Sequence, residues 1–461
     1  MQTYDSIIIG AGQAGPSMAV GLVGLGRRVA LFEGSLLGGS CVNYGCTPTK
    51  TLRKSARVAH LVRRAGEFGI HTSAPQVDFA AVMARVQQVV SASRSGLEQW
   101  LSSYPGQLDV VDAYAQFDGR DGDLFRVRAG DALYAAPVIY LNTGTRAAVP
   151  PIAGLADVPY LDNVRLLALK KLPEHLIILG GSYIGLEMAQ IFRRLGSEVS
   201  IVEPAPRLAP REDPDVSAAL ADLLTQEGVT IYAGHNAVEV SEAHGTITVT
   251  LERGGHRLTA AGSHLLVATG RIPNTDRLNA SSVGLALDAR GFIEVNGQLE
   301  TNVPGIFALG DINKRGAFTH TSYQDHEIAL ANAKGEARSV DGRIMTYALF
   351  TDPPLGRVGM NETEARASGR RVLMAVHQMA NVSRAKEESE TVGLIKLLAD
   401  ADSGHLLGAT FFGIGGDEIV QIVGNFMAAG GTYHTMKEVL PVHPTVAEFL
   451  PTILNRLQPL E

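Results

Sequence analysis

A strand–loop–helix–strand unit occurs twice in this chain and constrains its fold more than any other feature. Residues 7–15 read Ile-Ile-Ile-Gly-Ala-Gly-Gln-Ala-Gly, and residues 177–185 read Ile-Ile-Leu-Gly-Gly-Ser-Tyr-Ile-Gly. Each run is followed by a helical stretch that stops at Leu-Gly and by a β-branched strand that ends in an acid, Glu33 or Glu203. The whole unit recurs at one offset, which predicts two Rossmann-like domains that each bind a dinucleotide.

The first loop has the spacing Gly10-x-Gly12-x-x-Gly15 between a strand and a helix. Gly10 permits the tight turn, Gly12 lets the backbone approach a pyrophosphate, and Gly15 allows the helix to pack closely on the strand. The helix N-terminus offers free N–H groups to the phosphates, and Glu33 can accept hydrogen bonds from ribose hydroxyls. A glycine-rich turn alone is common, but strand, helix and acid in register favour a bound dinucleotide over an empty turn.

The second loop, Gly180 to Gly185, has Ser182 where the middle glycine is expected. Serine is small enough to let a dinucleotide approach. Glu203 occupies the ribose position, where a carboxylate would repel a 2′-phosphate, so the sequence favours NADH over NADPH. Arg207 lies nearby and could reach a phosphate, which leaves NADPH open.

Other segments fit the same architecture. Residues 138–144 and 265–270 each read as a buried strand that runs into Thr-Gly, and residues 302–312 read as a buried strand that ends in Gly-Asp. Residues 79–101 have helical periodicity.

The sequence pattern changes from about residue 345. Alternating strands near 393–398 and 407–412 and a helix from about Asp417 have no glycine-rich loop between them. We expect an α/β fold with two Rossmann-like dinucleotide-binding domains, one inserted in the other, and a C-terminal α+β dimerisation domain. The predicted bounds are 1–147 (FAD-binding, first part), 148–271 (NAD(P)-binding), 272–340 (return to the FAD/central domain) and 341–461 (dimerisation).

Length, charge and hydropathy exclude some classes of protein. A chain of 461 residues exceeds one ordinary core. The net charge of −7 argues against a nucleic-acid partner or an anionic membrane surface. No apolar run approaches the ~18 residues of a membrane span, and the N-terminus has no secretory pattern. We therefore expect a cytoplasmic protein.

Cys41 and Cys46 are the only cysteines in the sequence. A reducing compartment makes a structural disulfide improbable, and two cysteines are too few for a closed zinc site, so we expect no resident metal. The pair reads as redox-active rather than as two buried free thiols. In a regular helix, five steps would separate the Cα atoms by about 7.5 Å, beyond the ~6.8 Å limit for a disulfide. A bridge therefore requires a loosened turn, which Gly45 could allow.

Residues 38–50, Gly-Gly-Ser-Cys-Val-Asn-Tyr-Gly-Cys-Thr-Pro-Thr-Lys, resemble the active-site segment of the class I pyridine nucleotide–disulfide oxidoreductases. That family includes glutathione reductase, dihydrolipoamide dehydrogenase and mercuric reductase. The resemblance extends over the chain through Ala-Thr-Gly-Arg-x-Pro-Asn at 268–274, Gly310-Asp311, and His-Pro-Thr-x-x-Glu at 443–448.

The resemblance implies FAD in the first loop, with Asp311 on its ribityl chain, and NAD(P)H in the second. Tyr183 matches an aromatic residue that covers the nicotinamide side of the flavin and moves aside for the coenzyme. Cys46 would be the flavin-proximal thiolate, and Cys41 the interchange thiol that attacks substrate. Lys50 and Glu187 match an ion pair beside the flavin, with Lys50 also in contact with the cofactor. Further expected cofactor positions are Gly39, Ser40, Ala115, Thr143, Gly144, Ile184, Gly270, Arg271 and Gly310.

His443 and Glu448 form a candidate acid–base pair near the C-terminus. A carboxylate five residues after a histidine can orient its ring through the second nitrogen, and such an imidazole can shuttle a proton for thiol–disulfide exchange. Family members are homodimers whose C-terminal segment completes the partner's site, so the resemblance implies a homodimer.

The sequence leaves the electron acceptor open. We expect electrons to pass from NAD(P)H through FAD and the Cys41–Cys46 disulfide to a small disulfide or a metal ion. Mercuric reductases carry an additional cysteine pair that this sequence lacks, which argues against efficient Hg(II) reduction. Residues 318–325 and 352–360 resemble flavoprotein reductases of the reactive-chlorine-resistance type. Alternatives are a dihydrolipoamide dehydrogenase and a flavoprotein NADH oxidase or redox sensor.

Overall fold

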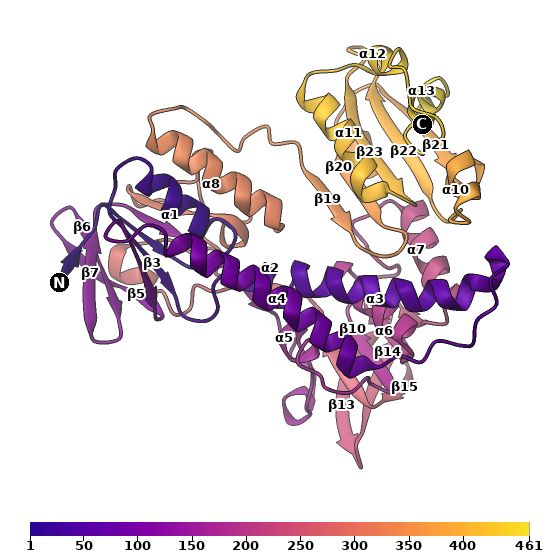
Figure 1. Cartoon of the computed structure of the whole chain (residues 1–461), viewed down its shortest axis with the longest axis horizontal. Coiled ribbons are helices and arrows are strands. Elements are labelled where there is room, and N and C mark those ends of the chain that lie inside the picture. Colours follow the sequence, from indigo (N-terminus) through magenta and orange to yellow (C-terminus); the bar gives the residue numbers. More distant parts are fainter. Residues whose placement is uncertain (461) are drawn as a thin grey trace.

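The structure is a computed structural model that describes residues 1–460 and shows three lobes (Figure 1). The N-terminal segments form the lobe at the left, the second glycine-rich loop lies in the lobe at the lower right, and the C-terminal sheet stands at the upper right. Among the described residues, no helix is long and apolar enough to cross a membrane. The expected α/β class, with two nucleotide domains and a third domain, is confirmed.

A five-stranded parallel sheet in the order β18-β8-β2-β3-β4 forms the centre of the first lobe. Strands β2, β3 and β8 are fully or largely buried, as the apolar runs of the sequence predict, whereas the edge strand β4 is mostly half-buried or exposed. Strand β18 follows the second nucleotide domain in the chain, so the last strand of the first sheet comes from sequence beyond that domain. The bounds are β2 Ser6–Ile9, β3 Val29–Glu33, β4 Leu108–Asp112, β8 Ile139–Leu141 and β18 Ile306–Ala308.

A smaller sheet, β1-β7-β6-β5, packs beside the central sheet. Helices α1 and α8 lie together on the other side of the central sheet (Figure 1). The bounds are β1 Gln2–Thr3, β5 Ala115–Asp121, β6 Leu124–Ala129, β7 Ala132–Ala136, α1 Gly15–Val23 and α8 Thr319–Ala333.

The second lobe repeats the parallel arrangement in the order β12-β11-β10-β16 and adds the antiparallel sheet β13-β14-β15. The linking strands β9 and β17 pair antiparallel, so the chain leaves and re-enters the first lobe at one place. This pairing is the physical basis of an inserted domain. The bounds are β9 Thr145–Ala147, α5 Asn163–Leu166, β10 His175–Leu179, α6 Tyr183–Leu195, β11 Glu198–Glu203, α7 Pro214–Gln226, β12 Thr230–Ala233, β13 Asn236–Ala243, β14 Thr246–Arg253, β15 His256–Gly262, β16 His264–Val267 and β17 Arg271–Pro273.

The C-terminal lobe is a six-stranded antiparallel sheet, β19-β20-β23-β22-β21-β24, with α11 against β20 and β23. The strands and helix expected from the sequence are present within two residues of their predicted ends. The bounds are β19 Thr346–Leu349, β20 Leu355–Gly359, α9 Glu362–Ala367, β21 Val372–Gln378, α10 Ser383–Glu387, β22 Leu394–Asp400, β23 Leu406–Phe412, α11 Gly416–Ala428, α12 Tyr433–Lys437, α13 Phe449–Leu454 and β24 Gln458–Pro459. The exact domain bounds remain predictions.

Helices α2 (Gly39–Tyr44), α3 (Cys46–Arg64) and α4 (Phe79–Leu101) connect the lobes (Figure 1). The helix expected over 79–101 is α4, with the predicted ends. Leu52 of α3 and Val86 of α4 belong to the same buried core as Leu186 of α6. The helix that begins at Cys46 is therefore fixed against the second nucleotide domain, although its sequence precedes that domain.

A buried ionic cluster adds to this connection. Asp352, whose side chain is almost fully buried, pairs with Arg194 of α6 and with Arg57 of α3. Gln190 donates to the Asp352 carbonyl over 2.8 Å. Burial alone would raise the pKa of Asp352, but the guanidinium of Arg194 and then that of Arg57 hold it below the usual value. The carboxylate is thus charged in the folded protein and joins three segments.

Candidate active site

One continuous cleft of about 3010 Å³ runs between the three lobes. It brings together residues that the sequence spreads over 300 positions. The predicted site residues that line it are Gly10, Gly12, Glu33, Gly39, Ser40, Cys41, Cys46, Lys50, Ala115, Thr143, Gly144, Gly180, Tyr183, Ile184, Glu187, Glu203, Gly270, Arg271 and Asp311. Gly15, Gly185 and Gly310 are buried behind its surface, and His443 and Glu448 lie outside it.

The first loop has the geometry that its glycines predict. Gly10 has a φ of +103°, and a Cβ there would lie 2.3 Å from the Asn142 carbonyl oxygen. A Cβ on Gly15 would lie 2.1 Å from the Gly10 carbonyl oxygen, so this glycine serves helix packing rather than ligand contact. Glu33 accepts hydrogen bonds from the backbone N–H of Ala11 and of Ser35, each over 2.9 Å. The Glu33 carboxylate therefore fixes the backbone of the loop and also lines the cleft.

Asn142 joins three parts of this site and was missed by the sequence analysis. Its side-chain oxygen accepts from the Gly15 N–H over 3.1 Å, and its side-chain nitrogen donates to the Leu309 carbonyl over 2.8 Å. The Gly310 N–H donates in turn to buried Asp325 over 2.8 Å. An amide directly after a buried strand was the available signal for Asn142.

The second loop repeats this geometry. Gly180 has a φ of +111°, and a Cβ on Gly185 would lie 2.0 Å from the Gly180 carbonyl oxygen. Ser182 is exposed at the start of α6, so the serine in place of glycine meets no crowded backbone. Glu203 accepts from the Gly181 N–H over 2.6 Å and from the Ala205 N–H over 2.8 Å.

Cys41 and Cys46 lie on opposite sides of a helix break. Cys41 belongs to α2, whereas Cys46 is the first residue of α3. Gly45 between them has φ −137° and ψ −113°, and a Cβ there would lie 2.9 Å from the Ser40 carbonyl oxygen. The expected loosened turn at Gly45 is confirmed. The two sulfurs are not joined by a disulfide in the structure.

The two thiols differ in acidity. Hydrogen bonding with Cys41 and then with Thr319, together with the charge of Lys50, lowers the pKa of Cys46 to about 6 against the effect of burial. The Thr319 hydroxyl lies 3.1 Å from the Cys46 sulfur. The hydrogen bond with Cys46, followed by burial, raises the pKa of Cys41. At neutral pH Cys46 is therefore the thiolate and Cys41 the thiol.

Lys50 and Glu187 form the expected ion pair, with Nζ 2.8 Å from Oε2. Glu187 also accepts from the backbone N–H of Phe350 over 2.9 Å, and the Lys50 ammonium lies 4.3 Å from the centre of the Phe350 ring. The pair thus joins α3, α6 and the start of the C-terminal sheet in the lining of the cleft.

Asp311 also lines the cleft and is linked to Arg271 through Thr145. The Thr145 hydroxyl donates to Asp311 over 3.2 Å, and Arg271 Nε donates to the same hydroxyl over 2.7 Å. Burial raises the pKa of Asp311 and lowers that of Arg271. This pair presents a carboxylate that can accept hydrogen bonds from polyol hydroxyls.

His443 and Glu448 have the expected mutual geometry, with Nδ1 2.8 Å from Oε2. The structure does not bring them to the cysteines of the same chain. The His443 side chain is 75% exposed, and Leu440 beside it is 93% exposed. An exposed imidazole with an oriented ring and apolar neighbours fits a surface that a second subunit covers.

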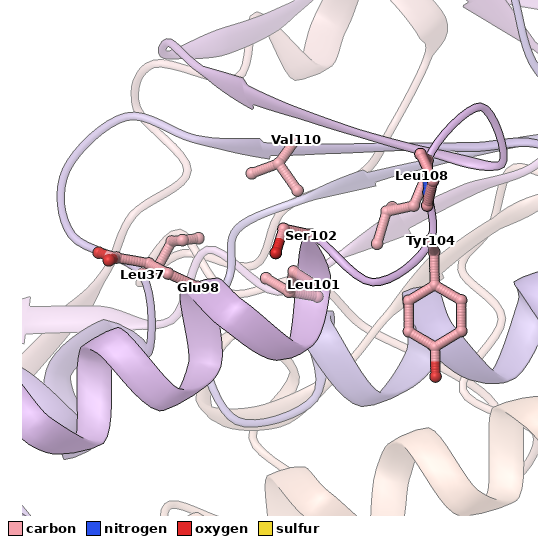
Figure 2. Close-up of a pocket in the computed structure, with 8 residues that line it drawn as sticks. Leu37, Glu98, Leu101, Ser102, Tyr104, Leu108 and Val110 are labelled. Carbon is pink, nitrogen blue, oxygen red and sulfur yellow. The ribbon is translucent and has the colours of Figure 1, made fainter.

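A second pocket of about 230 Å³ lies at the end of α4, between Leu37, Leu101 and Leu108 (Figure 2). It contains neither a glycine-rich loop nor a cysteine and is too small for a dinucleotide. Within residues 1–460, no cluster of three or more His, Cys, Asp or Glu side chains could hold a metal ion.

The cleft residues fit two dinucleotides. Both glycine-rich loops present helix N-termini in a cradle that a Cβ would fill. The Thr143 hydroxyl is buried among the described residues without a hydrogen-bond partner, as expected for a group that awaits a ligand.

Comparison with known proteins identifies the family. Residues 4–332 match the family described as pyridine nucleotide-disulphide oxidoreductase, and residues 345–453 match its dimerisation domain. The chain belongs to this family. The pyridine nucleotide-disulphide oxidoreductases use FAD and NAD(P)H, so the predicted flavoprotein oxidoreductase acting on a disulfide or metal-ion acceptor is confirmed. The dimerisation domain indicates a homodimer.

Several oxidoreductases of this family are similar over nearly the whole chain. The probable pyridine nucleotide-disulfide oxidoreductase RclA of Escherichia coli is 35% identical over 98% of both chains. A mercuric reductase of Lysinibacillus sphaericus is 32% identical over 97% of this chain and 81% of its own length. A dihydrolipoyl dehydrogenase of Halobacterium salinarum is 30% identical over 96% of this chain and 94% of its own.

Solved structures agree with these matches. A Cu(II) complex of the HOCl-induced flavoprotein disulfide reductase RclA from Escherichia coli has a TM-score of 0.89 and 34% identity, covering 99% of this chain and 100% of that one.

Proposed function

We propose that this enzyme transfers electrons from NADH through FAD and the Cys41–Cys46 pair to a small disulfide or a thiophilic metal ion. The observation that carries the proposal is the difference in acidity between the two thiols. Cys46, with its lowered pKa, lies beside the Lys50–Glu187 pair, and Cys41 keeps its proton. FAD supplies the two-electron chemistry between the nicotinamide and the disulfide when it is bound.

The two thiols have separate roles in this proposal. Cys41 attacks the acceptor disulfide and releases one thiol, and Cys46 then attacks Cys41 to release the second thiol and restore the Cys41–Cys46 disulfide. A raised pKa makes Cys41 a poor nucleophile until a base takes its proton. We assign that base to His443 of the partner subunit, because Glu448 orients its ring and the ring is exposed.

Cofactor placement follows the two loops. FAD is proposed to contact Gly10, Gly12, Glu33 and Asp311, and the coenzyme to contact Gly180 and Glu203. Glu203 is a buried carboxylate held by two backbone N–H groups, which supports NADH over NADPH. The comparison of kcat/KM for the two coenzymes tests this, and equal values would contradict it.

The acceptor class follows from the single thiol pair. Since the sequence holds only two cysteines, an acceptor must reach either Cys41 or the flavin directly. Copper in the RclA complex and mercury in the names of other relatives support a thiophilic metal ion as an acceptor beside a small disulfide. A reducing compartment such as the cytoplasm fits a dithiol centre.

Anaerobic titration with NADH tests the thiol roles. After two electrons, the wild-type holoenzyme is expected to develop a long-wavelength thiolate–flavin band. Cys41→Ser should keep the band, and Cys46→Ser should abolish it. The opposite pattern would reverse the assignment, and no band in the wild type would refute it.

A steady-state screen tests the acceptor. Lipoamide, oxidised glutathione, Cu(II), Hg(II) and oxygen would be compared with NADH as donor. Turnover with oxygen alone, retained in Cys41→Ser, would favour the alternative of a flavoprotein oxidase. Preference for lipoamide would favour a dihydrolipoamide dehydrogenase.

A further inference from the structure

Glu212 is a buried carboxylate in the lining of the cleft that accepts hydrogen bonds from three donors, one of them Tyr183 of the second glycine-rich loop. Its Oε1 accepts from the phenols of Tyr183 and of Tyr347, each over 2.7 Å. Its Oε2 accepts from Arg357 over 3.0 Å. Glu212 is 1% exposed and Arg357 is 2% exposed, so the pair is shielded from water.

The donors come from different parts of the fold. Tyr183 opens α6 in the second glycine-rich loop, whereas Tyr347 and Arg357 lie on adjacent strands of the C-terminal sheet. The Tyr183 and Tyr347 rings lie 5.6 Å apart between centroids, and Phe318 stacks on Tyr347 at 5.2 Å. The cluster therefore reaches from the coenzyme loop to the residue before Thr319, which contacts Cys46.

The carboxylate is anchored more firmly than Tyr183. Asp213, the next residue, pairs with Lys396 over 3.1 Å, and both are 1% exposed. Arg357 and Lys396, both in the C-terminal sheet, thus pair with two successive acidic residues that directly precede helix α7. By contrast, the neighbours of Tyr183, Ser182 and Ile184, are exposed. Among the three residues that donate hydrogen bonds to Glu212, Tyr183 is the one whose chain neighbours are exposed.

We propose that Glu212, Tyr347 and Arg357 form a latch that holds the Tyr183 side chain over the nicotinamide site, and that coenzyme binding breaks the Tyr183–Glu212 hydrogen bond. The inference rests on the proposed function, since Tyr183 is expected to move aside for the nicotinamide. Glu212 is a positioning residue in this scheme, because it acts on the coenzyme through Tyr183.

The arrangement makes the latch reversible. When Tyr183 leaves, Glu212 keeps Tyr347 and Arg357, so opening leaves no buried charge without a partner. Burial, followed by the charge of Glu212, raises the pKa of Tyr183, so its phenol remains a donor. Opening therefore requires the loss of one hydrogen bond to a charged group, and the coenzyme must compensate for it.

The test is NAD⁺ binding to the oxidised, FAD-loaded enzyme, followed by the change in flavin absorbance. Tyr183→Phe removes the latch bond and keeps the ring, so we expect the Kd for NAD⁺ to fall about 10-fold, or about 1.4 kcal/mol. Tyr347→Phe is the matched control, because it removes a phenol from the same Glu212 oxygen but leaves the Tyr183 bond. Its Kd should be unchanged or higher.

A second variant separates the latch from simple packing. Glu212→Gln should weaken the acceptor, and adding Tyr183→Phe to it should lower the Kd by much less than 10-fold. An unchanged Kd in Tyr183→Phe, an equal fall in Tyr347→Phe, or a full additional 10-fold fall in the double variant would each overturn the latch. A wild-type enzyme whose flavin NADH does not reduce would instead refute the proposed function.

Discussion

Thr319 offers the sharpest test of how the site sets the charge of Cys46. Its hydroxyl lies 3.1 Å from the Cys46 sulfur, and valine has nearly the same shape without the donor. Thr319→Val should raise the pKa of Cys46 because the thiolate loses a hydrogen bond that the thiol needs less. Hydrogen bonds to charged groups contribute about 1.5–3 kcal/mol net, and 1.36 kcal/mol corresponds to about one pKa unit.

The expected shift lies at the lower end of that range, because Cys41 and Lys50 still stabilise the thiolate. The pKa of Cys46 is lowered to about 6 in the wild type. We expect about 7 in Thr319→Val, from the loss of one such hydrogen bond.

The assay is a pH titration of the thiolate–flavin band in the two-electron-reduced holoenzyme. The thiolate exists above the pKa, so the band disappears as the pH falls. Its midpoint should lie about one pH unit higher in Thr319→Val. Thr51→Val is the control, since the Thr51 hydroxyl donates to the Thr47 carbonyl within α3 rather than to Cys46. An unchanged midpoint in Thr319→Val, or an equal shift in the control, would refute the reasoning.

Three other changes have defined outcomes. Lys50→Met leaves Glu187, 9% exposed, without its ion pair; denaturant unfolding should show a loss of about 1–3 kcal/mol, and no loss would contradict the pairing. His443→Ala should reduce turnover with disulfide acceptors by roughly 10²–10⁴-fold. Anaerobic reduction by NADH should keep its rate, so an equal loss in both would exclude a role in thiol exchange. Asp352→Asn should destabilise the fold by about 1–3 kcal/mol, because buried Arg194 loses one of its two carboxylate partners and keeps only Glu227. Since the pKa of Asp352 is lowered, the wild-type contribution is present above about pH 4 and is lost as the pH falls further; unchanged thermal unfolding of the variant at pH 7 would refute this.

The nucleotide loops were predictable because their constraints are local. A strand, a turn with positive φ and a helix that packs closely on the strand require glycine at fixed spacings, so Gly10 and Gly180 could be assigned from sequence alone. The helix break between the cysteines followed in the same way from the reach of a disulfide and the presence of Gly45.

Asn142, Thr319 and Glu212 could not be assigned in this way. Thr319 contacts Cys46 across 273 residues of sequence, and Tyr347 contacts Glu212 across 135. Such contacts depend on how separate segments return to one cleft, and a threonine or a glutamate carries no spacing pattern that marks it. The segment around Thr319 was noticed as a resemblance, but its chemical partner was not.

The sequence by itself determined that this chain folds into two Rossmann-like units and is related to the pyridine nucleotide–disulfide oxidoreductases, and it predicted Cys41 and Cys46 as the redox pair. Those conclusions rest on backbone geometry and residue spacing, which local sequence specifies. Only the tertiary structure decided which neighbours set the acidity of the two thiols, that Glu212 holds Tyr183, and that His443 lies outside the cleft that holds the cysteines of its own chain. Acidity and side-chain position depend on the charges and donors that surround a group in space, and folding brings these together from distant parts of the chain.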